Sequence, residues 1–164
     1  MFASIAFLSL ISAPFSFEVK PGFSLEPVAG YQFSDVSDNA AVMGGARLSF
    51  LQPNQRDAFI TGELEWMSQT VFTGKQKTPM YKWTAGGSVA FYEIFNPYAF
   101  RILVGGGIER RRNSFNPVFT YRAGLGRFFS ARCGIFADVG QRLISRTEKD
   151  SDPIETSLSA IIVF

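Results

Sequence analysis

The sequence predicts an all-β fold, an eight-stranded antiparallel up-and-down transmembrane β-barrel, and two observations carry the prediction. Apolar and polar residues alternate along eight successive segments, and period-two alternation places successive side chains on opposite faces of a strand. Most of these segments are also long enough for a tilted strand to cross a bilayer, which takes about 9–11 residues. The segments span 23–33, 42–50, 58–66, 81–91, 98–109, 119–126, 132–143 and 154–164.

Each of the first four segments has one face of apolar and small residues and one polar face. The first segment is interrupted by Pro27, where we expect a bulge, because proline has no N–H for the ladder of a closed barrel. The four apolar faces comprise Phe23, Leu25, Ala29, Tyr31 and Phe33; Val42, Gly44, Ala46, Leu48 and Phe50; Ala58, Ile60, Gly62, Leu64 and Trp66; and Tyr81, Trp83, Ala85, Gly87, Val89 and Phe91.

The last four segments repeat this alternation. Arg127 continues the apolar face of the sixth segment, so it is expected to face lipid. It lies close to the periplasmic end of that segment, where a charge on the lipid face costs only about 0–1 kcal/mol. The apolar faces comprise Tyr98, Phe100, Ile102, Val104 and Ile108; Phe119, Tyr121, Ala123 and Leu125; Cys133, Ile135, Ala137, Val139 and Leu143; and Ile154, Thr156, Leu158, Ala160, Ile162 and Phe164.

The polar faces of all eight segments carry charge. Only 18% of the chain is charged, against about 25% in an average soluble domain, and glycine and alanine are frequent on both faces. We therefore expect lipid outside and a packed polar lumen inside. The charged residues on the polar faces are Glu26, Arg47, Glu63, Glu65, Lys82, Arg101, Glu109, Arg122, Arg132, Asp138, Arg142 and Glu155.

Aromatic residues on the apolar faces gather toward the segment ends and predict two girdles at the membrane interfaces, where amphipathic rings are favoured. Connections around 53–56, 94–97 and 130 are short, and those at 35–39, 70–79, 110–117 and 145–152 are equal or longer. Short turns are typically periplasmic, so both termini are expected on that side. The predicted girdles comprise Tyr31, Trp66, Tyr81, Trp83, Phe119 and Tyr121 at the external end, and Phe50, Phe91, Tyr98, Phe100, Phe129 and Phe164 at the periplasmic end.

The lumen charges are expected to form ion pairs, because eight strands leave only enough space for side chains and an isolated buried charge is costly. Turn positions predict that Arg47 lies near Glu63, Lys82 opposite Glu109, and Arg122 opposite Asp138. The same groups could instead line a polar ion path through a narrow pore. A structural ion-pair ladder in a closed lumen is the interpretation that we favour.

Residues 1–16 resemble the apolar part of a secretory signal peptide, although no Lys or Arg precedes the apolar run. The run is too short for a transmembrane helix, which needs about 20 apolar residues. A buried strand or short helix is the alternative. We therefore expect a signal peptide over 1–16 and a single barrel domain over 17–164.

Segments 23–164 together resemble the small Gram-negative outer-membrane barrels of the OmpA and OmpX type. The resemblance rests on the architecture and on the last strand, which ends Ile161-Ile162-Val163-Phe164. It implies an outer-membrane location and recognition of the C-terminal strand by the barrel assembly machinery. It also implies a monomer that contacts outer-membrane lipid and lipopolysaccharide. No motif identifies a subfamily.

Enzymatic and nucleic-acid functions are not supported by the composition. The chain has no histidine, so the usual general base is missing. The lipid A-modifying and proteolytic barrels on this scaffold depend on a histidine, so their activities do not carry over. The net charge is only +2, which is too small to indicate nucleic-acid binding. Glu63 and Glu65 could be an acid/base pair, but no substrate cleft is evident. The single Cys133 is expected to be a small lipid-facing residue. We expect no catalytic residue, cofactor or metal.

The expected function is that of a non-enzymatic integral outer-membrane protein with a structural or surface-interaction role. One alternative is a narrow pore for small solutes, and another is a soluble lipocalin-like barrel with an apolar ligand inside. Cations in the external loops could contact lipopolysaccharide phosphates, although a solvated loop would have the same composition. These cations are Lys75, Lys77, Arg110, Arg111 and Arg112.

Overall fold

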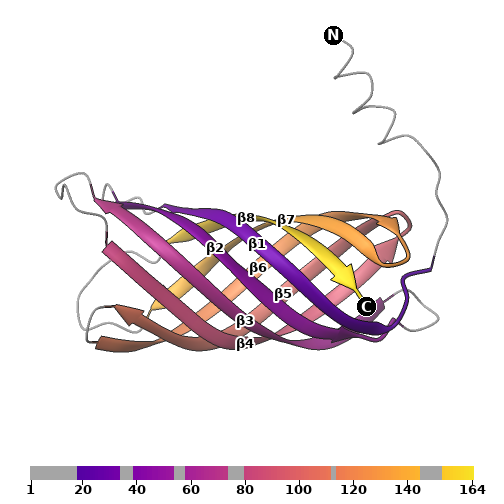
Figure 1. Cartoon of the computed structure of the whole chain (residues 1–164), viewed down its shortest axis with the longest axis horizontal. Coiled ribbons are helices and arrows are strands. Elements are labelled where there is room, and N and C mark those ends of the chain that lie inside the picture. Colours follow the sequence, from indigo (N-terminus) through magenta and orange to yellow (C-terminus); the bar gives the residue numbers. More distant parts are fainter. Residues whose placement is uncertain (1–17, 34–38, 54–57, 74–79, 112–113, 145–152) are drawn as a thin grey trace, which may run out of the picture.

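The chain forms a closed barrel in which each strand pairs antiparallel with the next and the last strand closes on the first (Figure 1). The computed structural model describes residues 18–33, 39–53, 58–73, 80–111, 114–144 and 153–164. The predicted fold class is confirmed. The strands are β1 (Gly22–Phe33), β2 (Asn39–Leu51), β3 (Ala58–Thr73), β4 (Met80–Phe95), β5 (Tyr98–Arg111), β6 (Ser114–Ser130), β7 (Cys133–Ile144) and β8 (Ile154–Val163).

The barrel has two different ends. The turn end carries the β2–β3, β4–β5 and β6–β7 connections, and the loop end carries the other connections. Both termini of the barrel lie at the turn end, where Lys20 N donates to Ala131 O at 2.9 Å and Val163 N donates to Arg132 O at 2.8 Å. The expected signal peptide over 1–16 lies outside the described residues. Within those residues, no helix is long and apolar enough to cross a membrane.

The strands reach further toward the loop end than the apolar alternation predicts. β3 continues to Thr73, and only two residues separate β5 from β6. Residues 70–73 of the expected connection 70–79, and residues 110–111 and 114–117 of the expected connection 110–117, are therefore strand. Backbone pairing causes this difference, because the ladder between β5 and β6 continues to Arg111↔Ser114 whatever the side chains are.

Pro27 does not cause the bulge that the sequence suggested. The β1–β8 register is the same on both sides of it, with Leu25↔Ile162 and Val28↔Ser159, and only the pairing of Glu26 and Pro27 with β8 is missing. The proline therefore interrupts a ladder without inserting a residue. The register shift in the described strands lies in β6 instead, between Phe128 and Ser130.

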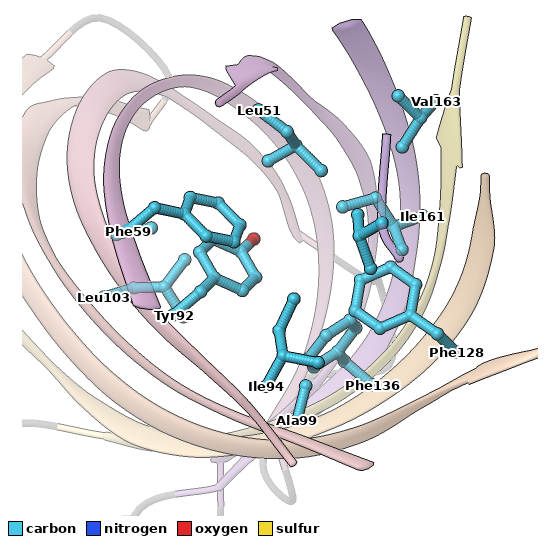
Figure 2. Packing of buried hydrophobic residues seen from close by; sticks show 12 residues of the cluster. Leu51, Phe59, Tyr92, Ile94, Ala99, Leu103, Phe128, Phe136, Ile161 and Val163 are labelled. Atoms are coloured by element: carbon cyan, nitrogen blue, oxygen red, sulfur yellow. The ribbon is translucent and has the colours of Figure 1, made fainter. Parts of the chain in front are cut away.

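The turn-end half of the lumen is filled by apolar side chains that point into the barrel (Figure 2). The rings of Phe59 and Tyr92 stack at 4.9 Å, and the Phe128 and Phe136 rings meet edge to face at 5.7 Å. Sequence reasoning assigned a polar lumen throughout and missed this apolar plug. The plug comprises Val19, Leu51, Phe59, Ala90, Tyr92, Ile94, Ala99, Leu103, Phe128, Phe136, Ile161 and Val163.

Candidate functional site

Above the apolar plug, the lumen holds a network of buried charges with Arg101 at its centre. Arg101 points inward from β5 and is fully buried. Its guanidinium donates to Glu26 Oε1 at 2.7 Å and to Asp138 Oδ2 at 2.6 Å. The guanidinium carbon also lies 4.2 Å from the ring centroid of Phe136, so Arg101 rests on the plug. One arginine thus joins β1, β5 and β7 through charge-assisted hydrogen bonds, which are the stronger kind.

Arg47 on β2 extends the network toward β3. It donates to Glu26 Oε1 at 2.7 Å and to Glu65 Oε2 at 2.9 Å, and it lies 3.4 Å from Asp138 Oδ2. Glu26 therefore accepts from both Arg47 and Arg101. Because the Glu26 carboxylate pairs with two guanidinium groups in good geometry, these contacts offset the cost of removing three charges from water.

The network continues through Arg122 on β6 and Arg142 on β7. Arg122 binds Glu65 and donates to Glu155 at 3.0 Å, and Arg142 Nε lies 2.6 Å from Glu155. Arg142 is also 3.9 Å from Glu109, which lies 3.6 Å from Lys82 Nζ. A continuous chain of ion pairs therefore runs from Arg101 to Lys82 and takes a side chain from each of the eight strands.

The six residues predicted to form lumen ion pairs all point into the lumen. Of the three expected pairs only Lys82–Glu109 forms, at 3.6 Å, and it is diagonal, because Lys82 lies opposite Arg111 and not opposite Glu109. Arg47 does not pair with Glu63, and Arg122 does not pair with Asp138. The expected registers are two residues off: Arg47 lies opposite Glu65, and Gly124 lies opposite Asp138. A register shift of two residues keeps every side chain on the same face of its strand but changes the residue opposite it. The sequence therefore predicts which residues line the lumen but not which of them form ion pairs.

Glu63 is the lumen acid that stands outside the ion-pair chain. Its Oε1 accepts from the Tyr92 hydroxyl at 2.9 Å, and its buried Oε2 has no hydrogen-bond partner among the described residues. Glu65 is held by Arg47 and Arg122. The two carboxylates therefore have different surroundings and do not form a matched pair facing a common cleft.

The outward faces carry exposed rings at both ends of the barrel. The predicted girdle residues all have outward parity, but Trp66 and Tyr121 lie halfway along β3 and β6 rather than at the ends, because both strands are longer than expected. Rings at strand ends that sequence reasoning left out are exposed as well. These are Phe72 and Phe115 at the loop end, and Phe95 at the turn end.

Of the cations expected to contact lipopolysaccharide, Lys75, Lys77 and Arg112 lie outside the described residues. Arg110 and Arg111 belong to β5 rather than to a loop. The Arg110 guanidinium carbon lies 5.5 Å from the Phe115 ring centroid and 6.0 Å from that of Trp83. A cation therefore sits among aromatic rings on the outer surface of the loop end.

The sequence matches no protein-family model and no curated protein. Solved structures are similar to it in fold. Neisserial surface protein A is 10% identical with a TM-score of 0.64, over 88% of this chain and 97% of that chain. The chain has the fold of the small transmembrane β-barrels. A de novo designed transmembrane β-barrel is 16% identical with a TM-score of 0.50, over 90% of this chain and 100% of the design.

A third structure is the outer membrane protein Ail of Yersinia pestis in a phospholipid bilayer nanodisc. It is 16% identical with a TM-score of 0.49, over 87% of this chain and 99% of that chain. At identities of 10% and 16%, the similarity to the first two structures shows the fold alone.

Proposed function

We propose that this chain is a non-enzymatic integral outer-membrane protein with a structural or surface-interaction role and with both termini in the periplasm. The observation that carries the proposal is the inverted polarity of the barrel. Leu64 and Leu125 point outward and are 68% and 69% exposed, whereas Arg101 and Arg142 are fully buried. A continuous exposed apolar surface of this kind is unfavourable in water and is satisfied by lipid.

The filled lumen supports a structural barrel over a narrow pore. The apolar plug occupies the turn end, and the ion-pair chain crosses the middle of the barrel. Because the guanidinium groups of Arg47, Arg101 and Arg122 are all engaged with carboxylates, an ion entering the lumen would have to replace buried pairs. A lipocalin-like function would require an apolar cavity at the centre, where this lumen is charged.

The proposal is tested by producing the protein with a secretion leader in a Gram-negative host. We expect it in the outer-membrane fraction, with folded and heat-denatured forms that migrate differently in detergent gels, because a closed barrel stays compact until it is heated. Planar bilayers containing the purified barrel should show no steady single-channel current. A soluble periplasmic product would refute membrane insertion, and steady channels would favour the pore.

Assembly of the barrel is proposed to depend on β8. The strand closes the barrel by pairing with both β1 and β7. Its exposed outward residues include Leu158 and Ile162, and the Phe164 ring next to the strand is exposed as well. This outward apolar alternation on the strand that closes the barrel supports recognition of β8 by the barrel assembly machinery, and the finished barrel is proposed to be a monomer.

Contact between the loop-end rim and lipopolysaccharide is also proposed, and the placement of Arg110 supports it. We expect replacement of Arg110, Arg111 and Arg112 by glutamine to weaken association with purified lipopolysaccharide by up to about fivefold, since exposed ion pairs each contribute little. Co-purified lipopolysaccharide, quantified against the Arg132→Gln variant at the opposite end, measures the effect. Equal amounts in the two variants would count against the contact.

A further inference from the structure

The outer surface of the barrel is hollowed across β5 to β8 and β1. One hollow of about 750 Å³ lies near the turn end, and a second of about 750 Å³ continues from it toward the loop end. Both volumes fall within the roughly 300–1,000 Å³ of ligand-binding clefts. The two share Ala29, Leu125, Ala137 and Leu158, and we call the continuous depression the lipid-facing groove.

Small outward residues create the groove. Across neighbouring strands the register sets Ala29 opposite Leu158, Leu158 opposite Ala137, and Ala137 opposite Leu125. Each alanine leaves a gap between larger side chains, and Ala160 beside Pro27 widens the turn-end part. In this row the gaps alternate with the protruding side chains of Leu125 and Leu158, which are 69% and 67% exposed, so the gap over Ala137 has a leucine on each side. The result is an apolar channel on a face that lipid covers in the proposed function.

A buried cation closes the turn end of this groove. Arg127 points outward from β6, yet it is only 9% exposed. Its guanidinium carbon lies 5.7 Å from the Tyr98 ring centroid and 5.9 Å from that of Phe129. Its buried Nε makes no hydrogen bond, and no described acid forms an ion pair with it.

Arginine keeps its charge in a protein, and a buried charge without a counter-charge is costly. The ion-pair chain shows that this barrel pairs its other buried guanidinium groups closely, so Arg127 stands apart. An anion supplied from outside the chain would provide the counter-charge that Arg127 lacks among the described residues. Because the cation borders an apolar groove, the anion that fits is one attached to hydrocarbon, with the rings of Tyr98 and Phe129 at the boundary between them.

We propose that the lipid-facing groove binds one anionic phospholipid, with its phosphate on Arg127 and an acyl chain over Ala137, between Leu125 and Leu158. The inference rests on the proposed membrane function. Arg127 lies near the turn end, which faces the periplasm in that proposal, and the periplasmic leaflet of the outer membrane consists of phospholipid. A guanidinium fork matches phosphate oxygens bidentately, and the groove shields the acyl chain.

The phosphate contact is tested on the folded barrel in mixed micelles, by native mass spectrometry with phosphatidylglycerol or phosphatidylcholine. We expect the natural sequence to retain one phosphatidylglycerol in preference to phosphatidylcholine. Arg127→Gln should lower that retention about tenfold, because a charge-assisted hydrogen bond is lost, and Arg127→Lys should retain an intermediate amount. The matched control is Arg132→Gln, which removes an exposed arginine in the adjacent turn and should retain the lipid fully.

The acyl-chain contact is tested by filling the groove. Ala137→Trp should abolish retention of phosphatidylglycerol while Arg127 is intact. Ala85→Trp is its control, because Ala85 points outward from β4 and lines neither hollow. Both substitutions place a ring on a lipid-facing surface, so both variants should fold.

The outcomes separate the two proposals. If the protein shows no heat-modifiable form and does not enter vesicles, the membrane function itself fails. If it inserts but binds both lipids equally, or if Arg127→Gln retains phosphatidylglycerol like the natural sequence, only the phospholipid site is overturned. Arg127 would then be stabilised by its two aromatic rings alone.

Discussion

Replacing Arg101 by methionine is expected to lower the free energy of unfolding of the barrel by about 3–5 kcal/mol, the cost of breaking a buried ion pair. The substitution leaves the carboxylates of Glu26 and Asp138 without their main donor in a fully buried site. Urea unfolding of the barrel in lipid vesicles, followed by tryptophan fluorescence, measures the change.

A triple variant separates the loss of pairing from the loss of packing. Arg101→Met combined with Glu26→Gln and Asp138→Asn removes the unpaired charges and should recover a large part of the lost stability, because neutral groups cost less to bury. Arg47 keeps Glu65 as a partner in this variant. If the triple variant were less stable than Arg101→Met alone, the charges would not be the source of the effect.

Replacing Gly45 by alanine is expected to lower the free energy of unfolding by about 1–3 kcal/mol, the usual cost of overpacking. Gly45 points into the lumen, where a Cβ would overlap the carbonyl oxygen of Trp66 and lie 2.8 Å from the Cα of Met67. These are backbone atoms of the neighbouring strand, so β2 and β3 would have to move apart. The same urea titration measures the effect.

The adjacent glycine provides the matched control. Gly44 lies on the outward face of β2, and a Cβ there meets no heavy atom within 4 Å. Gly44→Ala should therefore change the unfolding free energy by no more than about 0.5 kcal/mol, as is usual for surface substitutions. Equal losses for Gly44→Ala and Gly45→Ala would show that backbone freedom, and not lumen space, explains the glycines.

The location of the lumen charges was predictable from the sequence, but their partners were not. Arg122 lies on the polar face of its segment, and the structure buries it. Its partners Glu65 and Glu155 lie on β3 and β8, which are not neighbours of β6 in the barrel. Long side chains meet across the lumen, and no hairpin argument reaches such a contact.

The apolar plug is another feature that alternation alone could not reveal. Phe59 and Phe136 share the polar parity of their strands, so they lie on the face that was expected to line a polar lumen, and both are buried there. Phe59 meets Tyr92 and Phe136 meets Phe128 across neighbouring strands, whereas the Tyr92 and Phe136 rings come together at 5.9 Å from β4 and β7, which are not neighbours in the barrel. The sequence shows which face a ring occupies, and closure of the barrel sets its height.

The sequence by itself determined the eight strands, their antiparallel order and the face of nearly every side chain. It could do so because strand periodicity is local and because a register error of two residues leaves each face intact. The tertiary structure alone decided the ion-pair partners, the filled turn end and the buried state of Arg127 beside an apolar groove. These depend on the register, tilt and curvature of the closed barrel, which bring together residues that are distant in the chain.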